Sequence, residues 1–98
     1  MYVNMQRRTE SAVQDLRREG GRWLKELREA AGLSQRELAH AVGAEYYTFI
    51  SQVELGRGRV PPDKYKVWAA AVGVDTREFV MGLMHYYDPV TYNILFGD

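Results

Sequence analysis

The sequence predicts an all-α fold: a five-helix bundle with an N-terminal arm and an apolar C-terminal tail. Apolar residues recur at helical spacing in five successive segments, and a glycine or a proline marks the end of each segment. No segment favours a strand. The chain has 98 residues, 46% of them hydrophobic, which is enough for one core but not for two. We therefore expect one small domain of packed helices.

The N-terminal segment, residues 1–19, is polar and charged and shows only a weak helical pattern. It ends at Gly20 and Gly21, and two adjacent glycines usually mark a break. We therefore expect residues 1–19 to form an arm, which is either a separate helix or a partly disordered segment. The main domain then spans residues 20–85, and residues 86–98 form the tail.

Two helices are expected directly after this break. The first starts at Arg22 and ends at Gly32, because glycine is a good C-terminal cap. The second starts with a capping box, in which Ser34 is the cap and Glu37 follows three residues later. It ends at Gly43, where a turn needs the left-handed backbone that glycine adopts easily.

A third helix is expected over about residues 45–55, with Gly56 at its end. Residues 57–62 form a turn-rich connector, and its paired prolines suit the start of a fourth helix. Gly73 ends that fourth helix. The connector therefore separates the third helix from the rest of the bundle.

The fifth helix begins at an acidic capping box formed by Asp75 and Glu78. It should end before Pro89, because the residue that precedes a proline avoids helical angles. Residues 81–96 carry more apolar surface than one short helix can bury in so small a bundle. This surface either folds back on the core or forms a dimer interface, and a second protein is a further candidate partner. We favour a homodimer.

Some function classes are disfavoured by what the sequence lacks. The absence of cysteine excludes disulfides, thiolate catalysis and thiolate metal sites. His40 and His85 are far apart in sequence, and no carboxylate cluster has the spacing of metal ligands. No apolar run reaches the ~18 residues of a membrane span, and residues 1–8 lack the apolar block of a signal peptide. We expect a cytoplasmic protein that is not an enzyme and uses no metal and no cofactor.

The strongest motif combines several short elements in a fixed order. They are Gly32-Leu33-Ser34-Gln35 with Glu37-Leu38-Ala39, Gly43, Ile50-Ser51-Gln52-Val53-Glu54 with Gly56, and Ala71-Val72-Gly73-Val74 with Phe79. With these elements, residues 22–80 resemble the phage-repressor and Cro type of helix-turn-helix domain, the Xre family. The resemblance implies a repressor-like five-helix bundle whose third helix lies in the major groove of double-stranded DNA. It also implies a transcriptional regulator, expected to be a repressor, that binds DNA as a homodimer.

The sequence departs from the family between Gly43 and Ile50. Family members usually have five residues there, whereas this chain has the six of residues 44–49. We align on Ile50, because Ile50 and Val53 then keep one apolar seam, while the alternative register would bury Gln52. The extra residue lengthens either the turn or the first turn of the third helix.

On this alignment, the base-reading positions of the family fall on Tyr47, Thr48 and Gln52. Gln52 fits best, since a glutamine amide donates and accepts at adenine N6 and N7 together. Thr48 offers its hydroxyl to a base edge or its methyl group to thymine. Tyr47 offers its ring to a thymine methyl group or its hydroxyl to a phosphate. The alternative for Tyr46 and Tyr47 is that one of them packs into the core, because two adjacent helical residues cannot both point inward.

Contacts to the DNA backbone or groove are expected from Gln35, Tyr46, Ser51, Arg57 and Arg59. Gln35 matches the position at the start of the second helix that anchors a phosphate. Ser51 either does the same from the third helix or is a solvated surface serine. Arg57 and Arg59 lie where relatives carry basic residues, so phosphate contact is their expected role. Minor-groove insertion and simple solvation are the alternatives.

Charge is segregated along the chain although its net charge is zero. The net charges of residues 1–36, 37–56, 57–66 and 67–98 are +3, −3, +3 and −3. Phosphate neutralisation usually needs surplus Lys and Arg, so neutrality argues for modest non-specific affinity. A local basic surface can nevertheless coexist with an overall neutral protein.

Two other functions fit the same sequence. An antitoxin-like protein would repress its own operon through this domain and neutralise a partner protein through the tail. A protein-interaction module would keep the fold but lose DNA binding, and the neutral net charge is the only support for it. A partner that co-purifies through residues 81–98 would favour the first, and retained operator binding would exclude the second.

Overall fold

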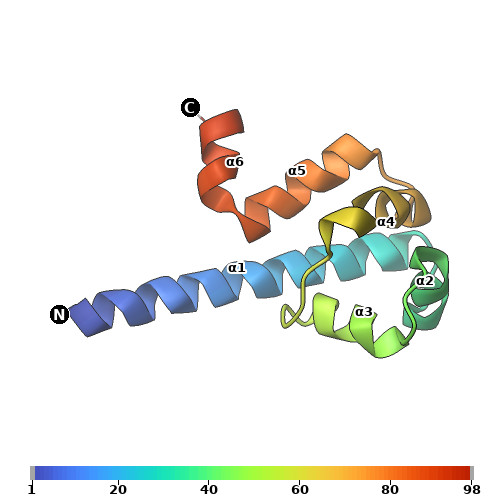
Figure 1. The fold of residues 1–98 in the computed structure, drawn as a ribbon, viewed down its shortest axis with the longest axis horizontal. Coiled ribbons are helices and arrows are strands. Elements are labelled where there is room, and N and C mark those ends of the chain that lie inside the picture. The colour runs from blue at the N-terminus through green and yellow to red at the C-terminus, as the bar shows by residue number, and fades with distance from the viewer. Residues whose placement is uncertain (1, 98) are drawn as a thin grey trace.

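The computed structural model describes residues 2–97, and within them the side chains of residues 10–97. The chain forms helices joined by short turns (Figure 1). In chain order they are α1 (Tyr2–Ala30), α2 (Gln35–Val42), α3 (Tyr47–Glu54), the 3₁₀ turn η1 (Pro62–Lys64), α4 (Tyr65–Val72), α5 (Thr76–Tyr87) and α6 (Pro89–Phe96). Residues 2–97 contain no strand, so the predicted all-α class is confirmed.

The hydrophobic core is built by α1 to α5 and by the connector that joins α3 to η1. Its largest fully buried side chains come from every one of these segments: Trp68, Phe79, Leu24, Leu38, Ile50, Leu83, Val42, Val53 and Val60. None of the residues of α6 is buried. The five predicted core helices therefore enclose the core, and α6 lies outside it.

The expected break at Gly20 and Gly21 is wrong, because α1 runs through both residues without interruption. Both glycines lie where another helix packs closely against α1, α5 at Gly20 and α3 at Gly21. A Cβ atom on Gly21 would collide with the carbonyl oxygen of Glu54, and one on Gly20 would lie 2.8 Å from the Cβ of Tyr86. Glycine weakens a helix by about 1 kcal/mol relative to alanine, but here it permits close packing of backbones. Gly20 and Gly21 therefore allow α5 and α3 to approach α1 closely, and they do not end the helix.

The predicted end of the fifth helix is confirmed, since α5 stops at Tyr87 and Pro89 begins the next helix. Asp88 caps this new helix by accepting a hydrogen bond from the backbone N–H of Thr91 at 3.1 Å. The tail is therefore helical, which its sequence did not indicate. Its apolar residues point mostly to solvent, among them Ile94, which is 76% exposed.

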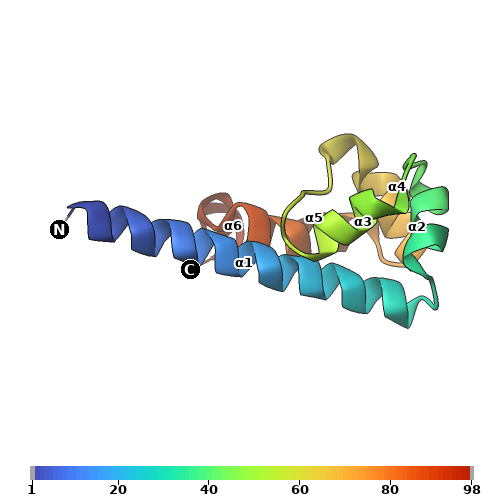
Figure 2. The same ribbon diagram turned by 90° about the horizontal axis from the view of Figure 1, so that it is seen from below.

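The molecule is elongated, with principal extents of 47 × 30 × 22 Å. In both views the first turns of α1 extend beyond the other helices (Figures 1 and 2), and Figure 1 shows α6 set at an angle to α5. None of the helices described here has the length and apolar character that crossing a membrane requires.

Candidate nucleic-acid interface

The helix-turn-helix is formed by α2 and α3, which pack closely on each other. Leu38 and Ala39 of α2 and Ile50 and Val53 of α3 are all buried in this contact and in the core behind it. Ala39 is 4% exposed, and its small side chain suits the close crossing of the two helices. Gly43 ends α2 with φ at +71°, in the left-handed region where other residues are strained. The turn thus aims α3 relative to α2.

The extra residue lies in the turn, because α3 begins only at Tyr47. The predicted start near residue 45 is therefore two residues too early. Tyr46 holds the N-cap position in an extended conformation, and its side chain makes no capping hydrogen bond. Ile50 is fully buried and Gln52 is exposed, as the alignment on Ile50 requires.

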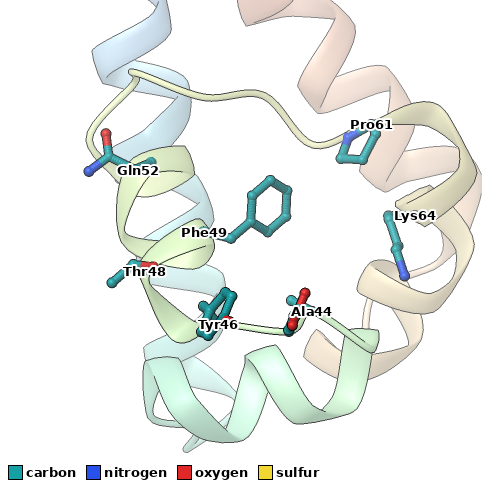
Figure 3. A pocket seen from close by; sticks show the side chains of 8 residues that line it. Ala44, Tyr46, Thr48, Phe49, Gln52, Pro61 and Lys64 are labelled. Carbon is teal, nitrogen blue, oxygen red and sulfur yellow. The ribbon is translucent and has the colours of Figure 1, made fainter.

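The three residues predicted to read bases all lie on the exposed surface of α3. Tyr47 is 43% exposed, and Thr48 and Gln52 are exposed as well. In Figure 3 the side chains of Thr48 and Gln52 project from α3 on the side away from Pro61 and Lys64. The outer face of α3 is therefore free to contact another molecule.

Neither Tyr46 nor Tyr47 packs into the core, so the alternative reading of this pair is wrong. Tyr46 is 65% exposed and lies beside the turn. The inward position belongs to Phe49, whose ring meets Trp68 edge-on with centroids 6.2 Å apart. With Phe49 filling the inner side, both tyrosines remain at the surface.

An open groove of about 410 Å³ runs between α3 and the segment that leads into α4 (Figure 3). Phe49 points into it from one side, and Pro61 and Lys64 form the other side. The Lys64 ammonium donates a hydrogen bond to the carbonyl oxygen of Val42 at 2.8 Å. This bond fastens η1, which forms one wall of the groove, to the end of α2.

A buried ion pair joins α1 to α3, and the sequence analysis did not predict it. Arg28 donates from Nε to Glu54 Oε2 at 2.7 Å and from Nη2 to Glu54 Oε1 at 3.1 Å, and from Nη1 to the carbonyl oxygen of Leu33 at 2.8 Å. The hydrogen bond to Glu54 raises the pKa of Arg28. Glu54 belongs to the motif, but no spacing rule connects it with a residue 26 positions earlier.

Gln35 takes part in the same network. Its Nε2 donates to Glu54 Oε1 at 3.1 Å, and the side chain is half-buried. The amide group predicted to anchor a phosphate is thus held in place by Glu54. Its carbonyl oxygen and its second amide hydrogen remain for other partners.

The negative charge of residues 37–56 is only partly presented at this surface. Glu54 is buried against Arg28, and Glu37 closes the capping box by accepting from the Ser34 backbone N–H at 2.9 Å. Glu45 is exposed beside the groove. Positive charge lies close to α3, since the guanidinium carbon of Arg36 is 4.8 Å from the ring centroid of Tyr47.

The remaining predicted contacts lie on α3 itself and on the connector that follows it. Ser51 is half-buried, while Arg57 and Arg59 are exposed on the connector. The guanidinium carbon of Arg59 lies 4.7 Å from the ring centroid of Tyr87. Tyr87 and Arg36 are thus two neighbours of this surface that the sequence reading missed.

Comparison with known protein families gives a match over residues 24–79 to the family described as Helix-turn-helix. These residues make up more than half of the chain and run from the last two turns of α1 to the first turn of α5. Comparison with curated proteins gives no match.

Proposed function

The chain belongs to the Xre type of helix-turn-helix family, whose members are DNA-binding transcription regulators, and we propose that it is a sequence-specific repressor. One observation carries the proposal. Ile50 and Val53 fix α3 in the core, while Tyr47, Thr48 and Gln52 stand on its exposed face. A helix held in this way has the width to enter the major groove of double-stranded DNA. A repressor of this kind acts in the cytoplasm, where the DNA is.

We assign base contacts to Tyr47, Thr48 and Gln52. The amide of Gln52 pairs with the N6 and N7 edge of adenine, and the hydroxyl or methyl group of Thr48 meets a neighbouring base. Tyr47 lies under the guanidinium of Arg36, so its ring and that charge approach the DNA together. The extra residue lies in the turn before α3, so it leaves the spacing of these three side chains along the helix unchanged.

Contacts with the backbone come from the residues around this face. The amide of Gln35 and the first turn of α2 bind one phosphate, because free N–H groups at a helix start favour an anion. Tyr46 and Ser51 contact the backbone beside α3. Arg57 and Arg59 neutralise phosphates from the connector, where the local net charge is +3 over residues 57–66.

We propose that a second copy of the chain covers α6. The helix carries no charged side chain between Pro89 and Phe96, so two copies meet there without like-charge repulsion. Val90, Ile94 and Leu95 are all more than half exposed. A two-fold dimer also presents two copies of α3, which matches the two-fold symmetry of a palindromic operator.

Selection of bound sequences from random double-stranded DNA tests these proposals together. The expected result is a palindromic site with half-sites about one helical turn apart. A promoter that contains this site should be silenced by the protein in a reporter assay. Binding without sequence preference would contradict the assignment of base contacts, and activation of the reporter would contradict repression.

A further inference from the structure

Tyr87, the last residue of α5, holds the connector between α3 and η1. Its hydroxyl oxygen accepts a hydrogen bond from the backbone N–H of Val60 at 3.2 Å. Its ring lies beneath the guanidinium of Arg59, whose carbon is 4.7 Å from the ring centroid. One side chain from a distant part of the sequence thus contacts two consecutive residues of the connector.

The contact with Val60 fixes the backbone. Val60 is 1% exposed, so its side chain belongs to the core, and its N–H would lack a partner without the Tyr87 hydroxyl. A buried N–H without a partner is costly. Burial raises the pKa of Tyr87, so the phenol stays protonated at neutral pH. The connector therefore has one favoured path past the end of α5.

The contact with Arg59 fixes a side chain without using up its hydrogen-bond donors. A guanidinium that lies on an aromatic face keeps its N–H groups in its own plane, directed outward. Arg59 is exposed, so these groups are available to a ligand. A planar array of such donors matches the oxygen atoms of a phosphate. Stacking also lowers the entropy that this long side chain loses when it binds.

We propose that Tyr87 is a positioning residue for DNA binding, which holds the connector in place and keeps Arg59 ready for a phosphate of the DNA backbone. The inference rests on the proposed function, because it assigns Arg59 to DNA. It gives the junction of α5 and α6 a role in the strength of DNA binding, although the junction lies outside the helix-turn-helix.

Titration of a labelled selected operator with the full chain, at several salt concentrations, tests the inference. Arg59→Ala should reduce the slope of log K against log salt by about 0.9, the value for one phosphate contact. Tyr87→Leu should weaken binding about three- to fivefold, the range for loss of a cation–π contact of this kind. In the Arg59→Ala background, Tyr87→Leu should cost clearly less affinity than in the wild type, because only its hold on the connector is then lost.

Tyr86→Leu is the matched control, because the ring of Tyr86 packs at a tilt against Trp23, with ring centroids 5.8 Å apart, and not on the connector. It should leave both the affinity for the operator and the salt slope unchanged. If Tyr87→Leu does not fold, Arg59→Lys gives an independent answer, because lysine keeps the charge but not the planar array of donors. Arg59→Lys should bind about threefold more weakly than the wild type.

Several results would overturn the inference. If Tyr87→Leu lowered the affinity equally in the wild-type and Arg59→Ala backgrounds, Tyr87 would be a structural residue that does not act through Arg59. Unchanged binding by Arg59→Lys would show that the planar donors of Arg59 do not contribute to binding, so their orientation by Tyr87 would have no effect. If the wild type bound no DNA, both the inference and the proposed function would be wrong. If the wild type bound its operator and only the Tyr87 effects were absent, the proposed function would stand alone.

Discussion

Arg28 and Glu54 form a two-point ion pair between α1 and α3, with the Arg28 Nε 2.7 Å from the Glu54 Oε2. Their side chains are only 10% and 3% exposed. Glu54 also accepts a hydrogen bond from Gln35. One carboxylate therefore connects the supporting helix α1, the start of α2 and the end of α3. The outer face of α3 depends on a residue that does not lie on that face.

Removal of the Glu54 carboxylate should destabilise the fold strongly, because Arg28 would remain buried without a partner. For Glu54→Ala we expect a loss of about 3–5 kcal/mol in the free energy of unfolding, measured by urea titration. Glu45→Ala, a change of the same residue type at an exposed position, should stay within about 0.5 kcal/mol of the wild type. Equal effects of the two variants would show that the ion pair does not stabilise the fold.

A methyl group at Gly21 should also destabilise the protein, although alanine is normally the better helix former. Gly21→Ala places a Cβ against the backbone of Glu54, which cannot move without shifting α3. We expect a loss of about 1–3 kcal/mol in the free energy of unfolding, as for other overpacked sites. Glu19→Ala, on the exposed side of the same helix, should change it by less than about 0.5 kcal/mol. A gain in stability from Gly21→Ala would mean that α1 and α3 do not approach each other so closely.

This glycine pair illustrates how far the sequence alone can lead. Local signals were sufficient for the number of core helices and for where each of them ends, because a cap or an apolar stripe depends on neighbours along the chain. The capping box of Ser34 and Glu37 and the end of α5 before Pro89 were predicted in this way. The role of Gly21 depends on Glu54, which is 33 positions away, and no local signal separates a glycine at a helix crossing from one at a break.

The same distinction applies to the candidate interface. The apolar seam of Ile50 and Val53 located the exposed face of α3, because one side of a short helix defines the other. The network of Arg28, Glu54 and Gln35 joins three elements and therefore appears only in the folded chain. The contacts of Tyr87 with Arg59 and Val60 also join distant parts of the chain, so they too appear only in the folded chain.

The capping box should make stability depend on pH in a defined direction. Hydrogen bonds from Ser34, chiefly from its backbone, lower the pKa of Glu37 below its ordinary value. Folding therefore favours the carboxylate, and its contribution is complete above about pH 4.5 and is lost as the pH falls further. Urea unfolding from pH 7 to pH 3 should show the wild type more stable than Glu37→Gln at neutral pH. The difference should shrink below about pH 4.5. A difference that does not vary with pH would exclude this linkage.

Gln52→Ala should reduce sequence discrimination more than overall affinity. The variant loses the amide pair at adenine, which is worth about 1–3 kcal/mol of preference for the right base. Binding to unrelated DNA should be nearly unchanged. Arg57→Ala is the complementary variant, because loss of a phosphate contact should weaken both kinds of binding and reduce the salt slope by about 0.9. Titration of the selected operator and of a scrambled duplex distinguishes the two patterns. An equal loss on both duplexes for Gln52→Ala would remove Gln52 from the base-reading set.

A charge on α6 should separate the two copies of the chain without unfolding either of them. Ile94 is 76% exposed, so Ile94→Asp costs the single chain little, but it puts two carboxylates into a two-fold interface. Sedimentation equilibrium should give a dimer for the wild type and a monomer for the variant. Affinity for the palindromic operator should fall about a hundredfold or more, because two separate monomers bind the half-sites independently, whereas the dimer holds its second copy near the second half-site.

Ala70→Asp is the matched control for this experiment. Ala70 is exposed on α4, outside the proposed interface, so the same added charge should leave the dimer intact. If the wild type is a monomer both free and on DNA, α6 does not join two copies. If the wild type instead forms a defined complex with another protein that Ile94→Asp breaks, α6 serves the partner of an antitoxin-like regulator. Loss of operator binding with the dimer preserved would place Ile94 in the DNA-binding domain itself, which its position outside the core argues against.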